Sequence, residues 1–214
     1  MDDQAISERG WRGSADLWLD AAYTLLIEGG VEAVKVMPLA TRLGLSRTSF
    51  YWHFADREAL LAGLIARWQS RNTANLVART ETPAPTIAEA VLNLFDCWIN
   101  ADLFDARMEF AIRAWALRDA ALSGVLAATD AQRIAAIAAM FQRHGFEAVE
   151  AETRARTLYL TQVGYIAMRT EESLAQRLHR IPAYVLTFTG QQPTQDAVAA
   201  FCARHSDQTG QQRQ

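Results

Sequence analysis

Several patterns that would signal a particular chemistry are missing from this sequence of 214 residues. The only two cysteines, Cys97 and Cys202, lie far apart, and this spacing predicts neither a disulfide framework nor a metal site but a reducing compartment. No stretch reaches the roughly 18 apolar residues that a membrane span needs, and the N-terminus lacks a basic start followed by an apolar run. We therefore expect a cytoplasmic protein that is neither secreted nor embedded in a membrane.

The patterns that accompany catalysis are missing as well. The four histidines are scattered and form no pair at metal-binding spacing; they are His53, His144, His179 and His205. A glycine-rich phosphate loop, a Gly-x-Ser-x-Gly elbow and a Cys-x-x-Cys pair are all absent. Tertiary structure could still assemble a site from distant residues, but the sequence itself predicts no catalytic residues, no metal and no cofactor.

Charge is unevenly distributed along the chain, although its net value is only −3. Residues 33–79 carry seven basic and two acidic side chains, whereas the segments before and after them are both net acidic. A local basic segment beside an acidic body is expected when one patch binds phosphate and the rest of the protein stays clear of it.

Helical patterns account for nearly the whole chain, and 50% hydrophobic content is ample for a core. We predict an all-α fold of about nine to ten helices, with an N-terminal three-helix helix-turn-helix domain and a C-terminal helical domain for ligand binding and dimerisation. The helices are expected at residues 14–29, 38–43, 46–54, 56–75, 86–98, 105–115, 119–144 with a break near 129–130, 147–168, 172–180, 182–188 and 194–205. Residues 31–37 are expected to be extended, residues 1–13 to form a mobile arm, and the glutamine-rich end to be disordered.

The domain boundary is expected near Thr82-Pro-Ala-Pro-Thr86, because two prolines within four residues cannot continue a helix. We assign residues 1–55 to the helix-turn-helix domain and residues 76–214 to the second domain. The helix over residues 56–75 then connects the two.

Residues 39–54 predict the helix-turn-helix itself. Leu39 and Leu43 give the first helix an apolar side, Gly44 permits the left-handed step that ends it, and Ser46 is placed to cap the second helix. At about 100° per residue, Phe50 falls on the side of the second helix that faces the first.

The opposite side of that second helix is expected to carry an aromatic and polar surface suited to a major groove. We expect Thr48, Ser49 and Trp52 to meet base edges, and Tyr51 and His53 to reach phosphates on the walls of the groove. Arg47, at the start of the helix, suits either purpose.

The run from Lys35 to Leu60, with its Gly-Leu-Ser turn and Phe-Tyr-Trp-His-Phe segment, resembles the DNA-binding signature of the tetracycline-repressor (TetR) family. The resemblance implies that Tyr51 to Phe54 close the recognition helix and that Arg57 touches the DNA backbone. Three positions depart from the usual pattern, because Lys35 replaces a phosphate-binding threonine, Pro38 a polar residue, and Arg57 a lysine. The residues expected to contact DNA are Lys35, Ser46, Arg47, Thr48, Ser49, Tyr51, Trp52, His53 and Arg57.

The C-terminal domain offers bulky aromatics and two polar side chains on helices that are expected to pack together. In TetR relatives the equivalent helices enclose an effector, so the resemblance implies a small-molecule cavity here. The expected lining residues are Trp98, Phe104, Phe110, Arg113, Trp115, Tyr159, Gln162 and Tyr165. A plain hydrophobic core is the alternative interpretation of the same aromatics.

One recognition helix contacts only a few base pairs, so we expect a homodimer on a palindromic double-stranded DNA operator. The helices beginning at Glu147 and Pro182 are the expected dimer interface, since the family uses these regions for a four-helix bundle. The most favoured function is a transcriptional repressor that a small-molecule effector releases from DNA. The alternatives are a ligand-independent DNA-binding regulator and, third, an all-helical enzyme or scaffold.

Overall fold

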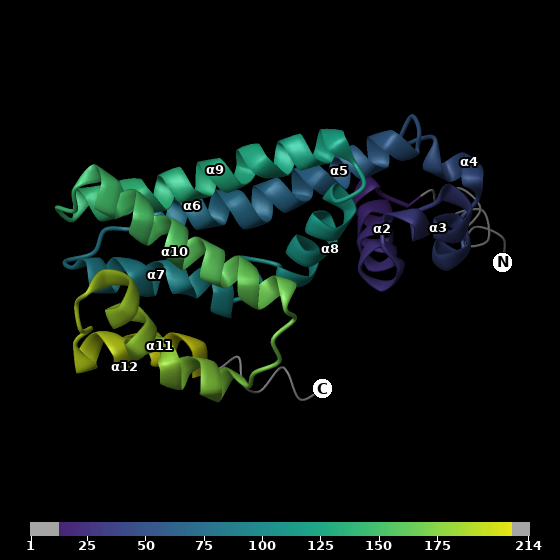
Figure 1. The fold of residues 1–214 in the computed structure, drawn as a ribbon. Coiled ribbons are helices and arrows are strands. Elements are labelled where there is room, and N and C mark those ends of the chain that lie inside the picture. The colour runs from purple at the N-terminus through teal and green to yellow at the C-terminus, as the bar shows by residue number, and fades with distance from the viewer. Residues whose placement is uncertain (1–12, 207–214) are drawn as a thin grey trace.

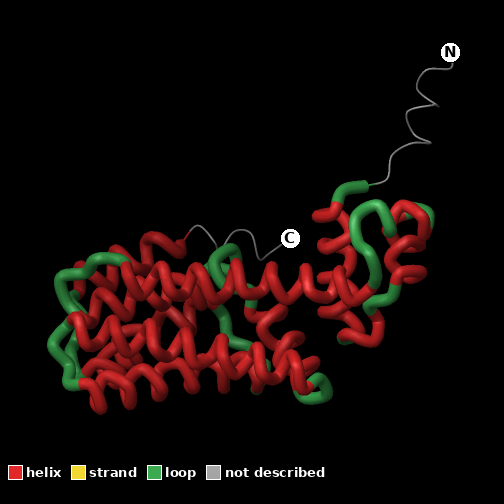
Figure 2. The backbone as a smooth tube through the Cα atoms, turned by 90° about the horizontal axis from the view of Figure 1, so that it is seen from above, coloured by secondary structure: helices red, strands yellow, loops and turns green. Residues whose placement is uncertain are grey.

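The computed structural model describes residues 13–206, and within them the chain forms helices and loops but no strand (Figure 2). The predicted all-α fold class is confirmed. The expected glutamine-rich tail and, apart from Gly13, the expected N-terminal arm lie outside the described residues.

The helices follow one another through short loops, in an order close to the predicted one. Toward the N-terminus they are α2 (Ala15–Gly29), the 3₁₀ turn η1 (Val31–Ala33), α3 (Val36–Leu43), α4 (Arg47–Phe50), α5 (Arg57–Trp68), the π-helical turn η2 (Gln69–Thr73) and α6 (Ala74–Glu81). Then come α7 (Ile87–Ile99), α8 (Ala106–Ala116), α9 (Ala120–Arg143), α10 (Ala148–Ala167), α11 (Leu174–Thr189) and α12 (Gln195–Ser206).

The molecule has a small end built from α2, α3 and α4 and a larger helical body that contains α7 and α9 to α12 (Figure 1). Each part has its own cluster of buried apolar side chains. Trp18, Leu39 and Phe50 are fully buried at the small end, and Val91 and Phe141 are fully buried in the body. The two cores are joined by helices that run from one part to the other.

One of these helices is the connecting helix, made of α5, η2 and α6 without interruption. We predicted that it ends near Asn75, but it continues to Glu81. Leu76 and Thr80 on its last turns are buried, and α6 packs against α7 and α9. The burial of these side chains extends the helix, and no proline interrupts the chain before Pro83. Counted as one helix, this segment brings the described helices to ten, within the predicted number.

The second joining element is α8, which lies beyond the expected domain boundary yet packs against α2 and α5. Met108, Ile112 and Trp115 belong to the same buried cluster as the helix-turn-helix core. At the start of α8, the hydroxyl of Tyr23 on α2 donates to Asp105 Oδ2 at 2.8 Å. Burial, followed by this hydrogen bond, raises the pKa of Tyr23 to about 12, so the phenol keeps its proton at neutral pH. The small end is therefore attached to the body by α8 as well as by the connecting helix.

The predicted break between two short helices at residue 181 is wrong, because α11 is one helix with Pro182 inside it. A proline inside a helix removes one backbone hydrogen bond and costs about 3 kcal/mol. Ile181, Val185 and Phe188 are all buried along one side of α11, against α7 and α10. Burying three large side chains, at about 1.5–3 kcal/mol each, outweighs that cost.

Two further segments differ from the prediction made from the sequence. The segment after Gly30 is not extended throughout, since η1 forms a 3₁₀ turn and α3 begins at Val36 with Pro38 in its first turn. The predicted break near Thr129 is absent, and α9 runs unbroken. Thr129 donates its hydroxyl proton to the carbonyl of Val125 one turn earlier at 2.8 Å, which is compatible with a continuous helix.

Of the described helices, α9 alone is long and apolar enough to cross a membrane by length and composition. It packs here along one side of the body against α6, α8 and α10. Its Arg133 side chain is fully buried and pairs with Glu109 of α8 at 2.8 Å. Its inner side therefore carries a buried ion pair with the neighbouring helix.

The carboxylate of Glu109 is the centre of a buried polar network between the connecting helix and the body. Its Oε2 accepts from Trp68 Nε1 at 2.6 Å and from Asn72 Nδ2 at 3.0 Å. Its Oε1 accepts from Arg113 Nε at 3.0 Å and from Arg133 Nη1 at 2.8 Å. Four donors from α5, η2, α8 and α9 thus share one carboxylate.

The network extends to α10 through Tyr159, whose hydroxyl donates to Asp130 Oδ1 at 2.6 Å and accepts from Arg133 at 3.0 Å. Burial opposes ionisation of Glu109, but the charge of Arg133 and the hydrogen bonds outweigh it, so the pKa of Glu109 lies below its ordinary value. The carboxylate is therefore ionised at neutral pH. Charge within the network is balanced by two arginines and two carboxylates.

We predict that Glu109→Gln lowers the free energy of unfolding at pH 7 by about 3–5 kcal/mol, because Arg113 and Arg133 lose a buried counter-charge. The pKa of Glu109 is depressed in the folded state, so its contribution is complete above the ordinary carboxyl pKa of about 4.5 and is lost as pH falls through the lower folded value. Urea unfolding of both proteins, at neutral and acidic pH, measures this difference and its decrease on acidification.

The matched control is Glu152→Gln, which removes a half-exposed carboxylate paired with Arg156 one turn away on α10. This change is expected to cost less than about 0.5 kcal/mol. Equal effects of the two substitutions would show that the Glu109 network does not stabilise the joint.

Candidate nucleic-acid interface and ligand pocket

The helix-turn-helix is shaped by two local features that the sequence predicts. Gly44 has φ 63° and ends α3, and its backbone N–H donates to the carbonyls of Ala40 and Thr41. Ser46 then caps α4, since its side chain accepts from the backbone N–H of Ser49 at 3.2 Å. α4 is shorter than predicted: it is a single turn that passes into hydrogen-bonded turns up to Phe54.

The inner side of α4 is fixed by aromatic packing. Phe50 is fully buried, with its ring centroid 5.4 Å from Trp18 of α2 and 5.5 Å from Phe54. Aromatic pairs at these separations stabilise beyond the area that they bury. This anchor fixes the direction in which the rest of the segment faces.

The outer side carries three exposed side chains, Thr48, Tyr51 and Trp52. Tyr51 is 47% exposed and Trp52 is 63% exposed, which is unusual for residues of this size. Arg47 Nη2 donates to the Tyr51 hydroxyl at 3.0 Å, and its guanidinium lies 5.6 Å from the Tyr51 ring centroid. The segment therefore presents an ordered cationic and aromatic surface, which we call the reader surface: Arg47, Thr48, Tyr51 and Trp52. His53 lies half-buried at its edge.

Ser49 is not on this surface, contrary to our prediction. It is only 8% exposed, and its hydroxyl lies 3.0 Å from the hydroxyl of Ser46. The cause is local, because the cap draws the side chains of residues 46 and 49 together beneath the start of the helix. Ser46 itself is exposed.

Two predicted phosphate contacts have different surroundings. Lys35 is exposed at the start of α3. Arg57 is directed into the domain, where Nε donates to the carbonyl of Val34 at 2.6 Å and Nη2 to that of Val31 at 2.8 Å. This geometry gives Arg57 a structural part in fixing η1.

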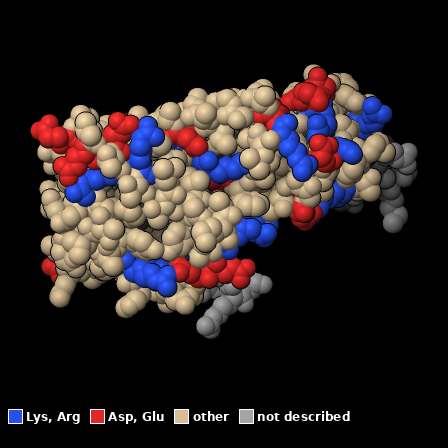
Figure 3. Space-filling model, in the orientation of Figure 1, with Lys and Arg blue, Asp and Glu red and all other residues tan. Residues whose placement is uncertain are grey.

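Lys and Arg side chains are frequent over the end of the molecule that carries α2 to α5, with acidic side chains among them (Figure 3). Several of these charges are paired: Arg42 lies 2.8 Å from Glu28, and Arg67 lies 2.6 Å from Asp20. Pairing within the domain reduces the effective positive charge of the basic segment. On the reader surface, in contrast, Arg47 contacts the hydroxyl of Tyr51.

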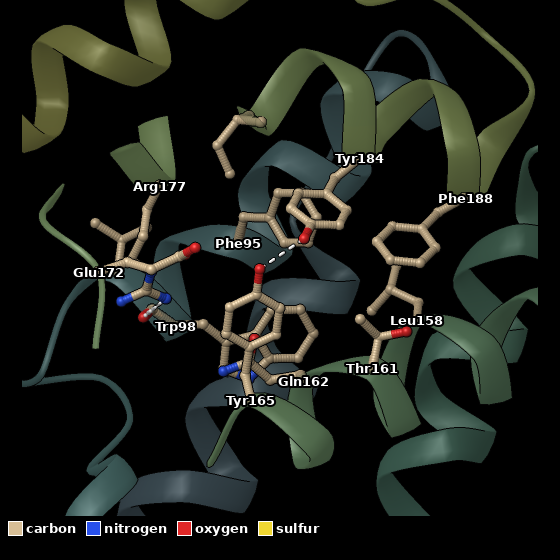
Figure 4. Close-up of a pocket in the computed structure, with 12 residues that line it drawn as sticks. Phe95, Trp98, Leu158, Thr161, Gln162, Tyr165, Glu172, Arg177, Tyr184 and Phe188 are labelled. Atoms are coloured by element: carbon tan, nitrogen blue, oxygen red, sulfur yellow. Dashed lines mark hydrogen bonds between the residues drawn. The ribbon is translucent and has the colours of Figure 1, made fainter. Parts of the chain in front are cut away.

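A cavity of about 450 Å³ opens where α8, α10 and the segment before α11 meet. Ile27 of α2 forms part of its wall, so the cavity touches the small end of the molecule directly. A smaller hollow of about 50 Å³ adjoins it between α7, α10 and α11 and shares Trp98 and Tyr165 with it. In Figure 4 the hydroxyls of Tyr165 and Tyr184 meet across this hollow, at 2.6 Å.

Half of the predicted lining residues lie on the wall of the cavity, namely Trp98, Phe110, Gln162 and Tyr165. The other four are elsewhere. Trp115 is buried in the core of the small end and donates to Asp119 at 3.1 Å. Phe104 is buried, with its ring centroid 5.5 Å from the Arg133 guanidinium, while Arg113 and Tyr159 belong to the Glu109 network. All four are large side chains at helical spacing. Periodicity alone does not distinguish a side chain in the core from one that lines a pocket.

Sequence reasoning missed the charged part of the wall. Arg107, Arg169 and Arg177 all line the cavity, together with Glu171 and Glu172. They lie on α8, in the segment between α10 and α11, and on α11, so no single local pattern connects them. Among the described residues, no group of three or more His, Cys, Asp or Glu side chains could hold a metal ion.

The family model that matches this chain is that of bacterial regulatory proteins of the tetR family, over residues 19–64. These residues include α3, α4 and most of α2 and α5. The chain is also 38% identical over 61 residues to the class A tetracycline repressor protein from transposon 1721 of Escherichia coli. That match covers 28% of this chain and 28% of the repressor, so the relative's length is largely unmatched in sequence.

The fold is similar over a greater length. A crystal structure of a protein assigned to the TetR family of transcriptional regulators, from Mesorhizobium loti, aligns with a TM-score of 0.56 at 17% identity. The alignment covers 88% of this chain and 95% of that chain. The resemblance of the helix-turn-helix to the TetR family is thus confirmed, and the fold along most of the chain is shared with a protein assigned to that family.

Proposed function

We propose that the protein is a DNA-binding transcriptional regulator, a repressor that binds a palindromic operator as a homodimer and is released by a small-molecule effector. The observation that carries the proposal is the reader surface, which stands exposed on a helix-turn-helix that matches the tetR family. The match of the helix-turn-helix to the family supports regulation of transcription, and the surface supplies the chemistry for it.

The reader surface suits a major groove. Trp52 and Thr48 offer apolar contact to thymine methyl groups and a hydroxyl to base edges, and Tyr51 with Arg47 offers donors to phosphate or guanine. Ser46, Lys35 and His53 border this surface as further candidates for backbone contact. We leave Ser49 and Arg57 out of the proposed contacts because the fold uses both side chains internally.

Dimerisation through α10 and α11 is supported by a largely uncharged stripe on their outer faces, bordered on α10 by the ion pair of Arg156 and Glu152. Leu160 on α10 is 57% exposed and Leu186 on α11 is 44% exposed. Between and around them lie small or hydroxylated residues, and all of the following are at least partly exposed: Thr153, Thr157, Thr161, Gly164, Ala183 and Thr187. Two antiparallel copies of α10 and α11 would cover this stripe in a twofold four-helix interface.

Control by a ligand is favoured over a ligand-independent regulator by the position of the cavity. Its wall includes Ile27 of α2 and Phe110 of α8, and α8 packs directly against the helix-turn-helix core. A ligand that fits best when α8 and α2 are displaced shifts the population toward an arrangement in which the two reader surfaces no longer match the groove spacing. The same cavity gives no support to an enzyme or scaffold.

We predict that selection from random DNA recovers a palindrome whose half-sites lie about one helical turn apart, near 34 Å, or somewhat more. On that operator, Trp52→Ala is expected to weaken binding by about 5- to 150-fold, which corresponds to 1–3 kcal/mol for a lost base contact. Fluorescence anisotropy with labelled operator measures the change.

The control for this substitution is Leu117→Ala, because Leu117 is also apolar and 86% exposed but lies at the end of α8. It should leave operator affinity unchanged, and both variants should keep the wild-type melting temperature. Unchanged affinity of the Trp52 variant would remove the reader surface from the proposal.

We also predict that Leu160→Glu converts the dimer to a monomer in sedimentation experiments and lowers operator affinity by at least tenfold, since each subunit reads only half of the site. A like charge would face its copy across the proposed interface. Val125→Glu on α9, at a position that is 37% exposed, provides the control and should remain dimeric. A dimer that persists in the Leu160 variant would place the interface elsewhere.

A further inference from the structure

We propose that the cavity takes an anionic ligand, a carboxylate on a flat apolar body, with Arg177 as the residue that binds the carboxylate. The inference rests on the proposed function of this cavity as the effector site and adds the chemical class of the effector. The cavity wall carries more hydrogen-bond donors than acceptors and more unpaired positive than negative charges, and these observations support the inference.

Arg177 is the half-buried cation of this wall. Its Nη2 donates to the backbone carbonyl of Trp98 at 2.7 Å, and it forms no ion pair with a carboxylate of the described residues (Figure 4). Burial lowers the pKa of Arg177 below its ordinary value, and the charge of Glu172 compensates only in part. A guanidinium in this position gains most from an added anion, which it can hold with two parallel hydrogen bonds.

The other charged side chains of the wall also favour an anion. Arg107 and Arg169 form no ion pair with any described carboxylate, and the Arg169 guanidinium lies over the ring of Phe110, 5.5 Å from its centroid. Of the two carboxylates, Glu172 is paired with Arg180 outside the cavity, which leaves Glu171. Three arginines thus face one unpaired glutamate.

Trp98 adds an unused donor to the same wall. The residue is only 7% exposed, and its Nε1 is buried without a hydrogen-bond partner. An indole N–H donates and cannot accept, and the same holds for a guanidinium. A ligand that satisfies both must supply acceptors, and a carboxylate supplies two oxygens with several lone pairs.

The remainder of the wall defines the body of the ligand. Phe110, Tyr165 and Trp98 are aromatic, and Ile27 and Ile166 are aliphatic. A cavity of about 450 Å³ is within the range that encloses a small organic molecule. A flat ring system that carries a carboxylate fits both the apolar walls and the cationic side, and its apolar end would meet Ile27 of α2.

The test compares naphthylacetate with its neutral amide, naphthylacetamide, by titration calorimetry on the full-length protein at neutral pH. The two probes have nearly the same shape, so a difference in affinity reports the charge. We expect the carboxylate to bind at least about tenfold more tightly than the amide, as is typical of a charge-assisted pair. Arg177→Gln should reduce this preference to about twofold or less.

Two further variants keep the test decisive. Arg118→Gln removes an exposed arginine that is not on the cavity wall and should retain the full preference. Arg169→Gln changes an exposed wall residue and should reduce the preference several-fold even if the Arg177 variant unfolds. Equal binding of acid and amide, an unchanged preference in both wall variants, or no binding of naphthylacetate would each overturn the inference.

Operator binding by the ligand-free protein separates this inference from the proposed function. The wild type and the two wall variants should retain the operator equally, since none of these arginines lies on the reader surface. Operator binding without any preference for the carboxylate would overturn the anionic ligand alone, whereas loss of operator binding by the wild type would overturn the proposed function.

Discussion

The position of the connecting helix depends on one buried carboxylate. Glu109 accepts from Trp68 and Asn72 on that helix and from Arg113 and Arg133 in the body. Apolar packing tolerates small sliding between helices, but hydrogen bonds to a buried ion lose most of their energy when the donors move. The carboxylate therefore fixes how the helix that leaves the helix-turn-helix enters the larger part of the molecule.

α8 brings this network together with the cavity and with the core of the small end. Within one turn of α8, Glu109 accepts hydrogen bonds from the connecting helix, Phe110 lines the cavity, and Ile112 packs in the core of the helix-turn-helix. A rotation or shift of α8 changes all three environments at once. This arrangement is the physical reason for expecting binding in the cavity to alter the position of the reader surface, because a packed joint has few alternative arrangements.

Local patterns were sufficient for most of the fold and for the reader surface. The cap at Ser46, the glycine step at Gly44 and the burial of Phe50 all follow from residues within one or two turns of each other. The exception is Ser49, where a cap hydrogen bond decided the direction of a small polar side chain that helical geometry placed outward. Pro182 is the corresponding exception in the fold, because burial along α11 outweighed the local preference to begin a helix there.

By itself the sequence determined the all-α class, the helix-turn-helix and the aromatic surface upon it, since each depends on periodicity or on contacts between near neighbours in the chain. Only the tertiary structure decided which of the large side chains line a cavity and which are core, and which arginines remain without a counter-charge. Those outcomes depend on how α2, α8, α10 and α11 meet. Side chains from four distant segments share no periodicity, so the sequence pattern could not show that they line one cavity.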